Sequence, residues 1–335
     1  EIAQCLVGSE MCIRDSNEFI KNFGGCMVTK SRFTYLSRDG IHKCQAYKWQ
    51  NDNVPVKGIL QIIHGMQEHM ERYDEFASFM CDNGFIVVGN DHLGHGLTVL
   101  SEELGYFAKD NADVIVVRDV HRLKKMTEGE YPGLPYFILG HSMGSFIARK
   151  YLTMYGKGIR GAIICGTGTK PAIVTGFGKI LSSISGIFSK GHNKSGLISR
   201  LSFGGYNKKI ANPTGKNDWV VRNDDVLKKY NEDSLCGFPF TSNGFKTLFS
   251  ILHYVDNPKN LVSIPKSLPI FVIAGMCDPV GNYGKGPKKV YDTYKHIGIS
   301  DVSLKLYPDM RHEILNDIDR NIVYEDVLKW INSRI

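Results

Sequence analysis

Ser142 is the central residue of the sequence G-H-S-M-G at positions 140–144, which is a G-x-S-x-G motif. An apolar run at 136–139 precedes the motif and indicates a strand, while the pattern of 143–155 indicates a helix that follows at once. A sharp turn between such a strand and helix holds a serine hydroxyl out above the sheet, and the flanking glycines allow the close approach. We therefore predict that Ser142 is the nucleophile of an acyl-transfer reaction rather than a chance match to a short motif.

A serine hydroxyl is a weak nucleophile at neutral pH, so it needs a base to take its proton and an acid to orient that base. Asp278 follows an apolar run at 268–274, and His312 follows a second run at 302–307. Because the carboxyl ends of parallel strands meet at one edge of a sheet, we predict Asp278 as the acid and His312 as the base. The competing residues lie in a predicted helix, at the start of a strand, too near His312 or in an insertion: His296, Asp301, Asp309, Asp256 and His253.

Acyl transfer places negative charge on a carbonyl oxygen, and each backbone N–H group aimed at that oxygen contributes about 10² to 10³ in rate. One such N–H belongs to Met143, which follows Ser142 at the start of the predicted helix. The second lies in the loop after the predicted strand 58–63, where Gly65 permits a turn. We predict that the N–H groups of Met66 and Met143 form this oxyanion hole.

Four histidines in the loops near the predicted site suggest a metal centre as an alternative. They come from two separate loops with no helix that carries two ligands, and the serine mechanism needs no metal. We therefore predict no metal and no cofactor, and expect these side chains to shape the loops beneath the site. They are His64, His69, His92 and His95.

Eight short apolar runs indicate strands, and the first two flank an Asp-Gly turn signal that predicts a hairpin. The other runs alternate with amphipathic stretches, as in a parallel sheet that helices cover on both faces. The predicted strands are 32–36, 44–49, 58–63, 85–89, 136–139, 161–165, 268–274 and 302–307, and the predicted helices are 72–83, 113–127, 143–155, 287–297 and 323–331. The predicted fold class is therefore α/β, with a mostly parallel eight-stranded sheet.

The alternation stops at residue 170 and resumes at 266, so we predict that residues 170–265 are a helical cap inserted into the sheet domain. Residues 27–169 and 266–335 are then the two parts of the core. Residues 1–26 show no periodic element and look like translated adapter sequence. We expect a non-native or disordered leader there, with Met27 as the start of the natural protein.

Composition is that of a soluble globular protein, with 42% hydrophobic and 22% charged residues and no apolar run long enough to span a membrane. Eight cysteines without the spacing of zinc ligands or a disulfide framework favour reduced thiols and a cytoplasmic location. The net charge of +7 favours anionic surfaces such as lipid headgroups, with peripheral contact to a membrane, although a solvated basic surface is the simpler explanation. Basic residues do not form a stripe with interleaved aromatics, so we predict no nucleic-acid partner.

The first part of the insertion, residues 172–188, is rich in Ile, Val, Leu and Phe and carries few charges. Such a segment favours a lid that contacts an acyl chain, and we expect Phe177, Ile180 and Ile184 to contact the substrate. The alternative is an ordinary amphipathic helix that buries the same side chains against the core.

The chain resembles the monoglyceride lipase and lysophospholipase group of the α/β-hydrolase superfamily, which is also grouped with the serine aminopeptidases (S33). The resemblance covers Phe33 to the C-terminus and rests on several motifs in order. They are H-G-M-x-E-H followed by R-Y within 64–73, D-H-x-G-H-G at 91–96, G-H-S-M-G at 140–144, G-x-x-D-P-V-G at 275–281 and R-H-E at 311–313. Segments at 218–224 and 233–238 are similar to the cap of bacterial members. Ser145 stands where many relatives have a second glycine.

The resemblance implies a cofactor-free serine hydrolase with a lipid-facing cap. We expect it to cleave carboxylic esters of lipids, either monoacylglycerols or lysophospholipids, through an acyl-enzyme on Ser142. A general small-ester carboxylesterase and an S33-type peptidase stay open, because one fold and one triad serve many acyl groups. A non-catalytic binding protein is disfavoured by the intact Ser142, Asp278 and His312. Epoxide hydrolysis and dehalogenation would require an aspartate at this turn, so the serine excludes them.

Overall fold

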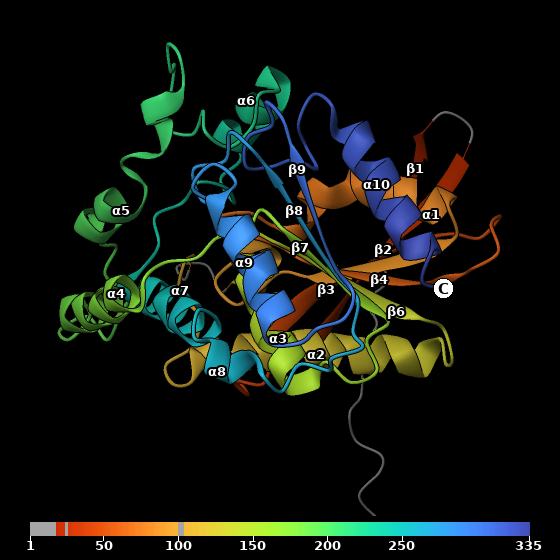
Figure 1. The fold of residues 1–335 in the computed structure, drawn as a ribbon, viewed down its shortest axis with the longest axis horizontal. Coiled ribbons are helices and arrows are strands. Elements are labelled where there is room, and N and C mark those ends of the chain that lie inside the picture. The colour runs from red at the N-terminus through yellow and green to blue at the C-terminus, as the bar shows by residue number, and fades with distance from the viewer. Residues whose placement is uncertain (1–17, 24–25, 100–103) are drawn as a thin grey trace, which may run out of the picture.

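One sheet organises the molecule, and the computed structural model describes residues 18–23, 26–99 and 104–335. Its strands are β1 (Glu18–Phe23), β2 (Cys26–Leu36), β3 (Lys43–Asn51), β4 (Gly58–Ile63), β5 (Phe85–Asn90), β6 (Tyr136–His141), β7 (Gly161–Cys165), β8 (Ile270–Gly275) and β9 (Val302–Tyr307). They form a nine-stranded sheet in the order β1-β2-β3-β5-β4-β6-β7-β8-β9 (Figure 1). The pairs from β1 to β5 along this order are antiparallel, and the pairs from β5 to β9 are parallel.

The predicted α/β class with a mostly parallel sheet is confirmed, and the eight predicted strands are β2 to β9. The ninth strand, β1, pairs with β2 and lies within residues 1–26, where the sequence pattern indicated no element. That expectation is wrong for Glu18–Phe23, because an edge strand bonds to one neighbour only and can form from a segment with a weak apolar pattern. The other residues of the predicted leader, 1–17 and 24–25, lie outside the described residues, and Cys26 begins β2.

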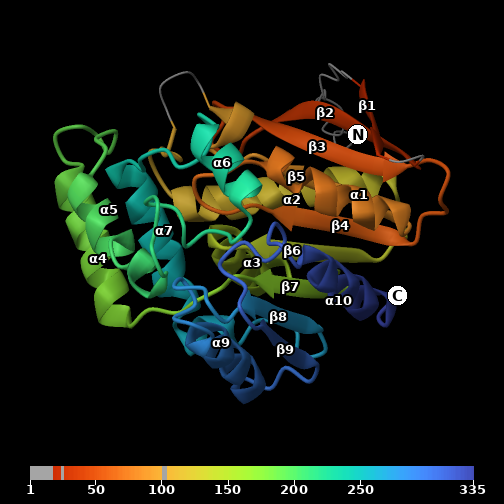
Figure 2. The ribbon, with the colours of Figure 1, turned by 90° about the horizontal axis from the view of Figure 1, so that it is seen from above.

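Helices cover both faces of the sheet. α1 (Asp74–Asp82) and α10 (Arg320–Asn332) pack on one face, and α2 (Ala112–Glu130), α3 (Met143–Tyr155) and α9 (Lys285–His296) pack on the other (Figures 1 and 2). In β4, Ile59 and Ile63 belong to the apolar cluster under α2 and α3, whereas Leu60 and Ile62 belong to the cluster under α1 and α10. Burial on both faces explains why these strands are continuous apolar runs. Two short 3-10 helices, η1 (Met70–Tyr73) and η2 (Gly96–Thr98), lie in the loops after β4 and β5.

The predicted helical cap is present between β7 and β8. It consists of α4 (Ala172–Ser185), α5 (Gly196–Phe203), η3 (Tyr206–Lys209), α6 (Asp224–Glu232), α7 (Ser242–Val255) and α8 (Pro258–Leu261). α7 packs against both α4 and α3, and its Phe245 and Ile251 are fully buried in the core cluster. α4 and α5 lie outside α7 at the left edge of the molecule in Figures 1 and 2. α7 therefore anchors the cap, and α4 and α5 form its outer layer.

No helix in the described part of the chain is both long enough and apolar enough to cross a membrane.

Candidate active site

Ser142 lies at the turn between β6 and α3, in a backbone conformation that side chains rarely adopt. Its φ is 52° and its ψ is −122°. A side chain at either flanking glycine would clash, because a Cβ on Gly140 would lie 2.3 Å from the Gly144 oxygen and a Cβ on Gly144 would lie 1.9 Å from the Ile63 oxygen. The strained turn and the two close approaches are the local geometry that the G-x-S-x-G motif predicts, and they hold Ser142 at the edge of the sheet.

Asp278 and His312 meet at the same edge of the sheet, after β8 and β9. Nδ1 of His312 lies 3.0 Å from Oδ2 of Asp278, and both residues are buried. The other oxygen of Asp278 accepts a hydrogen bond of 2.8 Å from the N–H of Val280, which fixes the carboxylate. With Nδ1 donating to Asp278, Nε2 of His312 carries the lone pair and can accept a proton. Ser142 and His312 line the same pocket.

The loop after β4 lies directly against Ser142. A Cβ on Gly65 would lie 3.0 Å from the Cβ of Ser142, so the glycine is needed for this approach. The N–H of Gly65 donates to the carboxylate of Glu68, which holds the loop in place. Within the described residues, neither the N–H of Met66 nor that of Met143 donates a hydrogen bond, and both residues line the pocket. These two N–H groups are therefore available to a ligand oxygen.

A buried network of charged side chains joins this loop to the loop that carries His312. Oε1 of Glu68 lies 3.1 Å from Nδ1 of His141 and accepts a hydrogen bond of 2.9 Å from the hydroxyl of Tyr73. Arg72 donates to Oε2 of Glu68 at 2.9 Å and pairs through both of its terminal nitrogens with Glu313. The sequence motifs contain these residues, but only the folded chain brings 64–73 to 311–313. No spacing along the chain predicts this network.

Glu68 and His141 stabilise each other's charged forms. Burial opposes the charge of Glu68, but the hydrogen bond and charge of His141, together with the charge of Arg72, hold the pKa of Glu68 below its ordinary value. Burial likewise opposes the charge of His141, and the hydrogen bond and charge of Glu68 outweigh it, so the pKa of His141 is raised. The pair is therefore a carboxylate and an imidazolium directly behind Ser142.

Replacing Glu68 with glutamine is expected to destabilise the protein by about 3 kcal/mol near pH 6, because it leaves buried positive charge without its partner. The lowered pKa of Glu68 gives stabilisation that is present above its ordinary pKa and lost as the pH falls through the lowered value. The raised pKa of His141 gives stabilisation that is full below its ordinary pKa and lost as the pH rises through the raised value. The difference between wild type and Glu68→Gln should therefore be largest between about pH 4.5 and 6.5.

Urea unfolding across this pH range measures the difference. The control is Asp292→Asn, which removes an exposed ion pair with Lys288 and should cost less than about 0.5 kcal/mol. A loss for Glu68→Gln no larger than that of the control would show that the network does not stabilise the loops.

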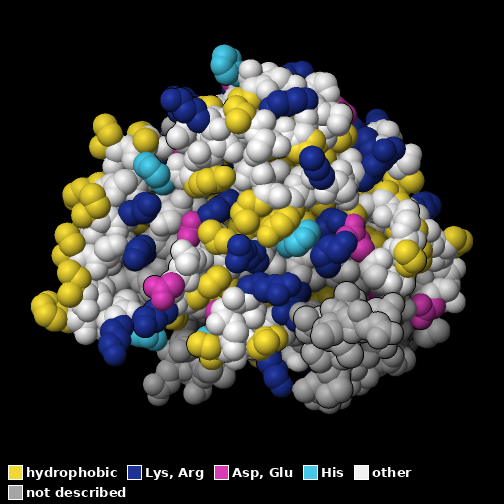
Figure 3. Space-filling model, turned by 90° about the horizontal axis from the view of Figure 1, so that it is seen from below, with side chains coloured by type: hydrophobic (Ala, Val, Ile, Leu, Met, Phe, Trp, Pro, Cys, Tyr) yellow, Lys and Arg dark blue, Asp and Glu magenta, His cyan; other side chains and the backbone are white. Residues whose placement is uncertain are grey.

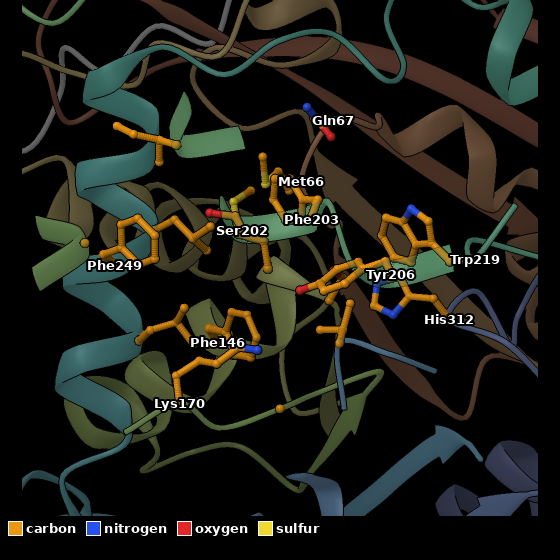
Figure 4. Close-up of a pocket in the computed structure, with 18 of the residues that line it drawn as sticks. Met66, Gln67, Phe146, Lys170, Ser202, Phe203, Tyr206, Trp219, Phe249 and His312 are labelled. Atoms are coloured by element: carbon orange, nitrogen blue, oxygen red, sulfur yellow. The ribbon is translucent and has the colours of Figure 1, made fainter. Parts of the chain in front are cut away.

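The pocket beside Ser142 is a mainly apolar cavity of about 230 Å³ between the sheet edge and the cap. One part of it lies near His312, where the ring of Trp219 is 5.2 Å from the imidazole and Tyr206 lies alongside (Figure 4). The other part lies toward α7, where Phe146 and Phe249 face the cavity (Figure 4). The cavity therefore has an aromatic end with hydroxyl and indole groups beside His312, and a mainly apolar end toward α7.

The structure brings only one of the three predicted substrate contacts into the pocket. Phe177 lines it, but Ile180 and Ile184 point to solvent with exposed fractions of 60% and 59%. α4 packs on α7 along the side that contains Gly178, where a Cβ would lie 2.8 Å from the ring of Phe249. Leu181, on this side of α4, lines the pocket instead. The expectation for Ile180 and Ile184 is therefore corrected, and so is the alternative in which the core buries them.

The four histidines near the site do not form one cluster. The rings of His64, His92 and His95 pack against one another, with centroids 4.1 Å apart for His64 and His92 and 5.3 Å apart for His64 and His95. Burial lowers the pKa of His92 to about 3 and that of His95 to about 4, so these rings are neutral. His64 accepts the N–H of His92 and contacts the oxygen of Gly65, which supports the loop of Met66. His69 points elsewhere, toward Asp233 of the cap.

Comparison with known proteins places the chain in a family. The sequence model described as serine aminopeptidase, S33 (Hydrolase_4) matches residues 54–319. A monoacylglycerol lipase of Mycolicibacterium smegmatis is 26% identical over 86% of this chain and 92% of its own length, and a monoglyceride lipase of Homo sapiens is 25% identical over 89% of each. A thermostable carboxyl esterase from Bacillus coagulans is 31% identical and superposes with a TM-score of 0.85 over 91% of this chain and 98% of that one. The chain therefore belongs to the serine aminopeptidase S33 family of hydrolases and has the α/β-hydrolase fold.

Proposed function

We propose that the protein is a serine carboxylic-ester hydrolase that cleaves lipid monoesters, either monoacylglycerols or lysophospholipids. The observation that carries this proposal is that His312, which is hydrogen-bonded to Asp278, lines the same pocket as Ser142 with its strained turn. The apolar lining of that pocket supports an acyl chain as the bound group. The names of the relatives, monoacylglycerol lipase and carboxyl esterase, support the same reaction class.

The proposed reaction has two acyl-transfer steps. His312 takes the proton of Ser142 as the serine oxygen attacks the ester carbon, and the N–H groups of Met66 and Met143 stabilise the negative oxygen that forms. The C–O bond to the glycerol breaks as His312 returns the proton to the leaving alcohol, which leaves an acyl ester on Ser142. Water then attacks this ester by the same route, and the fatty acid leaves with Ser142 free again. Asp278 orients His312 throughout.

A matched pair of substitutions in α4 tests whether an acyl chain lies in the pocket. Leu181 lines the pocket and Ile180, one residue away, points to solvent. Leu181→Ser should lower kcat/KM for dodecanoyl esters by about tenfold and leave acetate esters nearly unchanged, because a buried leucine contributes about 1.5 to 3 kcal/mol. Ile180→Ser should leave kcat/KM for soluble esters of every length unchanged. Equal losses for short and long esters in Leu181→Ser would contradict an acyl chain at this end of the pocket.

A peptidase of the same family is the main alternative, and an observation in the pocket argues against it. An aminopeptidase must bind a free amino group, and a carboxylate with no other cation as partner is the side chain that best offsets the cost of burying that charge. The acidic side chains among the described lining residues are Glu68 and Glu313, and Arg72 pairs with both. A hydrolysis panel of monoacylglycerols, lysophosphatidylcholine, p-nitrophenyl esters of graded length and aminoacyl amides separates the lipase, small-ester and peptidase alternatives.

We also propose that the outer face of the cap contacts a lipid surface. Seven large apolar side chains of α4 and the turn after it are exposed: Ile173, Val174, Phe177, Ile180, Ile184, Ile187 and Phe188. Hydrophobic side chains follow this edge of the molecule at the left of Figure 3. Residues 172–205 contain no Asp or Glu, and the exposed Lys190, Lys194 and Arg200 flank the apolar face. Phe177 also lines the pocket, so this face and the pocket are continuous.

Lipid binding of this face is expected to depend on its isoleucines. The double variant Ile180→Ser and Ile184→Ser should bind vesicles of phosphatidylcholine and phosphatidylglycerol at least about tenfold more weakly than wild type, since two apolar side chains no longer enter the interface. The control pair, Ile318→Ser and Ile322→Ser, removes two equally exposed isoleucines at the start of α10 and its preceding loop. Cosedimentation measures binding. Equal binding by both double variants would exclude α4 as the contact.

The described cysteines support a reducing location. Cys44, Cys81, Cys165, Cys236 and Cys277 are free thiols. Cysteines of secreted proteins commonly form disulfides, whereas those of cytosolic proteins stay reduced. The free thiols therefore support the proposal that the protein works in the cytoplasm, peripheral to a membrane.

A further inference from the structure

Three side chains with metal-binding chemistry meet between the loop of Met66 and the cap. His69 follows that loop, and Asp233 and Cys236 lie after α6 in the cap. One ligand atom of each residue lies within 4.8 Å of the others, and Nε2 of His69 is 2.8 Å from Oδ2 of Asp233. His69 and Cys236 are buried, and the side chain of Asp233 is about one-third exposed, at 34%. Among the described residues this is the one such group of His, Cys, Asp and Glu.

The donor set fits a zinc ion. An imidazole nitrogen, a carboxylate oxygen and a thiolate are each ordinary Zn²⁺ ligands, and three of them leave one position of a tetrahedron open. The partly exposed side chain of Asp233 gives that position access to water. The outer oxygen of Asp233, Oδ1, accepts the N–H of Leu235 at 2.8 Å, so the other oxygen faces His69. Hydrogen bonds of this kind orient metal ligands in known sites.

The two segments that supply the ligands are held together by bonds that do not involve the ligand atoms. The N–H of Gly237 donates to the oxygen of Gln67 at 3.0 Å, and the side chain of Gln67 donates to the oxygen of Phe238. The N–H of Cys236 donates to the oxygen of Asp233 at 3.0 Å, which closes a turn and brings these two ligands together. The ligands are therefore brought together before any ion binds, and this lowers the cost of ordering them.

Charges around the group also permit a cation. Arg72 stacks on Tyr230 of α6 and is a basic side chain whose charge acts on Cys236, but it is paired with both Glu68 and Glu313. The three carboxylates of Glu68, Glu313 and Asp233 carry more negative charge than Arg72 can balance, by two units. The charged His141, which pairs with Glu68, lowers this negative excess to one unit. An ion with two positive charges therefore meets a net negative environment.

We propose that His69, Asp233 and Cys236 form a Zn²⁺ site that fastens the cap to the loop of the oxyanion donor Met66. On binding, the thiol of Cys236 loses its proton to solvent, and His69 binds through Nε2 with its proton on Nδ1. The three ligands do not line the pocket, whereas Gln67 and Glu68 do. The ion therefore does not touch the substrate, and its role is to position the loop. This proposal does not depend on the identity of the ester that the enzyme cleaves.

Cobalt substitution of the metal-free full-length protein tests the site directly, because a cobalt–thiolate bond gives a near-ultraviolet absorption band that His and Asp ligands do not give. We expect wild type to show this band and to bind Co²⁺ saturably, with a Kd on the order of micromolar. Zn²⁺ should abolish the band by competition and raise Tm. Cys236→Ser and His69→Gln should weaken binding at least about 30-fold, because even the loss of a residue that only hydrogen-bonds to a metal ligand costs about 10- to 100-fold in affinity.

The matched control is Cys277→Ser, which removes an exposed thiol outside the group and should leave the band unchanged. A band that survives in Cys236→Ser, or disappears in Cys277→Ser, would overturn the proposal, as would the absence of saturable binding in wild type. If Cys236→Ser does not fold, amide hydrogen exchange of the wild-type protein with and without Zn²⁺ tests the site instead. Zn²⁺ is expected to slow exchange in α6 and the turn after it at least about tenfold, and unchanged exchange there would contradict the site.

Discussion

Replacing Ser142 with alanine is expected to lower kcat for ester hydrolysis by at least about 10⁴-fold, because no acyl-enzyme can form without the hydroxyl. The turn itself should persist, since the strain at φ 52° is imposed by β6, α3 and the two glycines that flank the residue rather than by the serine side chain. Substrate binding in the pocket should also persist. The variant should therefore bind a lipid monoester with nearly the wild-type Kd and fail to turn it over.

A second serine in the pocket provides the control for this experiment. Ser202 of α5 also lines the cavity, and Figure 4 shows its hydroxyl within it. Ser202→Ala should keep kcat within about tenfold of wild type, because it lacks the strained turn and the neighbouring His312. Comparable losses in both variants would show that Ser142 has no special role. Undiminished turnover in Ser142→Ala would contradict the acyl-enzyme mechanism.

Replacing Asp278 with asparagine is expected to lower kcat by about 10⁴-fold near pH 7, with little change in KM. Asparagine fills the same space, but its amide can turn an N–H toward Nδ1 of His312, which favours the wrong tautomer. Nε2 then carries the proton and cannot take the proton of Ser142. The N–H of Val280 donates a hydrogen bond of 2.8 Å to Oδ1 of Asp278. In the variant it would hold the amide oxygen at this position and leave the NH₂ group to face His312.

The control for Asp278 is Asp309, an exposed carboxylate three residues before His312 with a φ of 60°. Asparagine tolerates this conformation as well as aspartate does, so Asp309→Asn should leave kcat unchanged. Initial rates for a soluble ester between pH 6 and 9 separate the two variants. A loss for Asp278→Asn of less than about tenfold would show that the contact of 3.0 Å with His312 is structural and does not orient the base.

The sequence predicted the central sheet well because each buried strand has to be apolar on both sides. The short runs at β4, β6 and β8 are buried on both faces, so their pattern differs from that of an amphipathic helix. The turn residues of the Ser142 motif mark the boundary between β6 and α3. The order of Ser142, Asp278 and His312 follows from the same pattern, since each stands just beyond a strand. β1 escaped detection because an edge strand is defined by its partner β2 and not by its own composition.

The orientation of α4 could not be predicted from its sequence. The helical spacing of Phe177, Ile180 and Ile184 places them on one side of α4 and predicts that this side is buried. The structure instead buries the side of Thr175, Gly178 and Ser182 and leaves these three apolar side chains exposed. The contact between Gly178 and Phe249 decides which side faces the pocket, and Phe249 lies on another helix more than seventy positions along the chain.

The buried contacts around the site depend on folding in the same way. Glu68 and Glu313 are 245 positions apart and meet through Arg72, and His69 meets Cys236 only once the cap has packed. Periodicity carries no information about pairs of this kind, because it describes one element at a time.

Covalent trapping with a long-chain alkyl fluorophosphonate, followed by mass spectrometry of the proteolytic peptides, tests the central claim most directly. The reagent places a tetrahedral phosphorus where the ester carbon would react, and its alkyl chain requires the pocket. We expect a single adduct on the peptide that contains Ser142, which an excess of monoacylglycerol slows and which Asp278→Asn forms at least about 10²-fold more slowly. An adduct on another residue, or hydrolysis that continues in protein without an adduct on Ser142, would contradict the account.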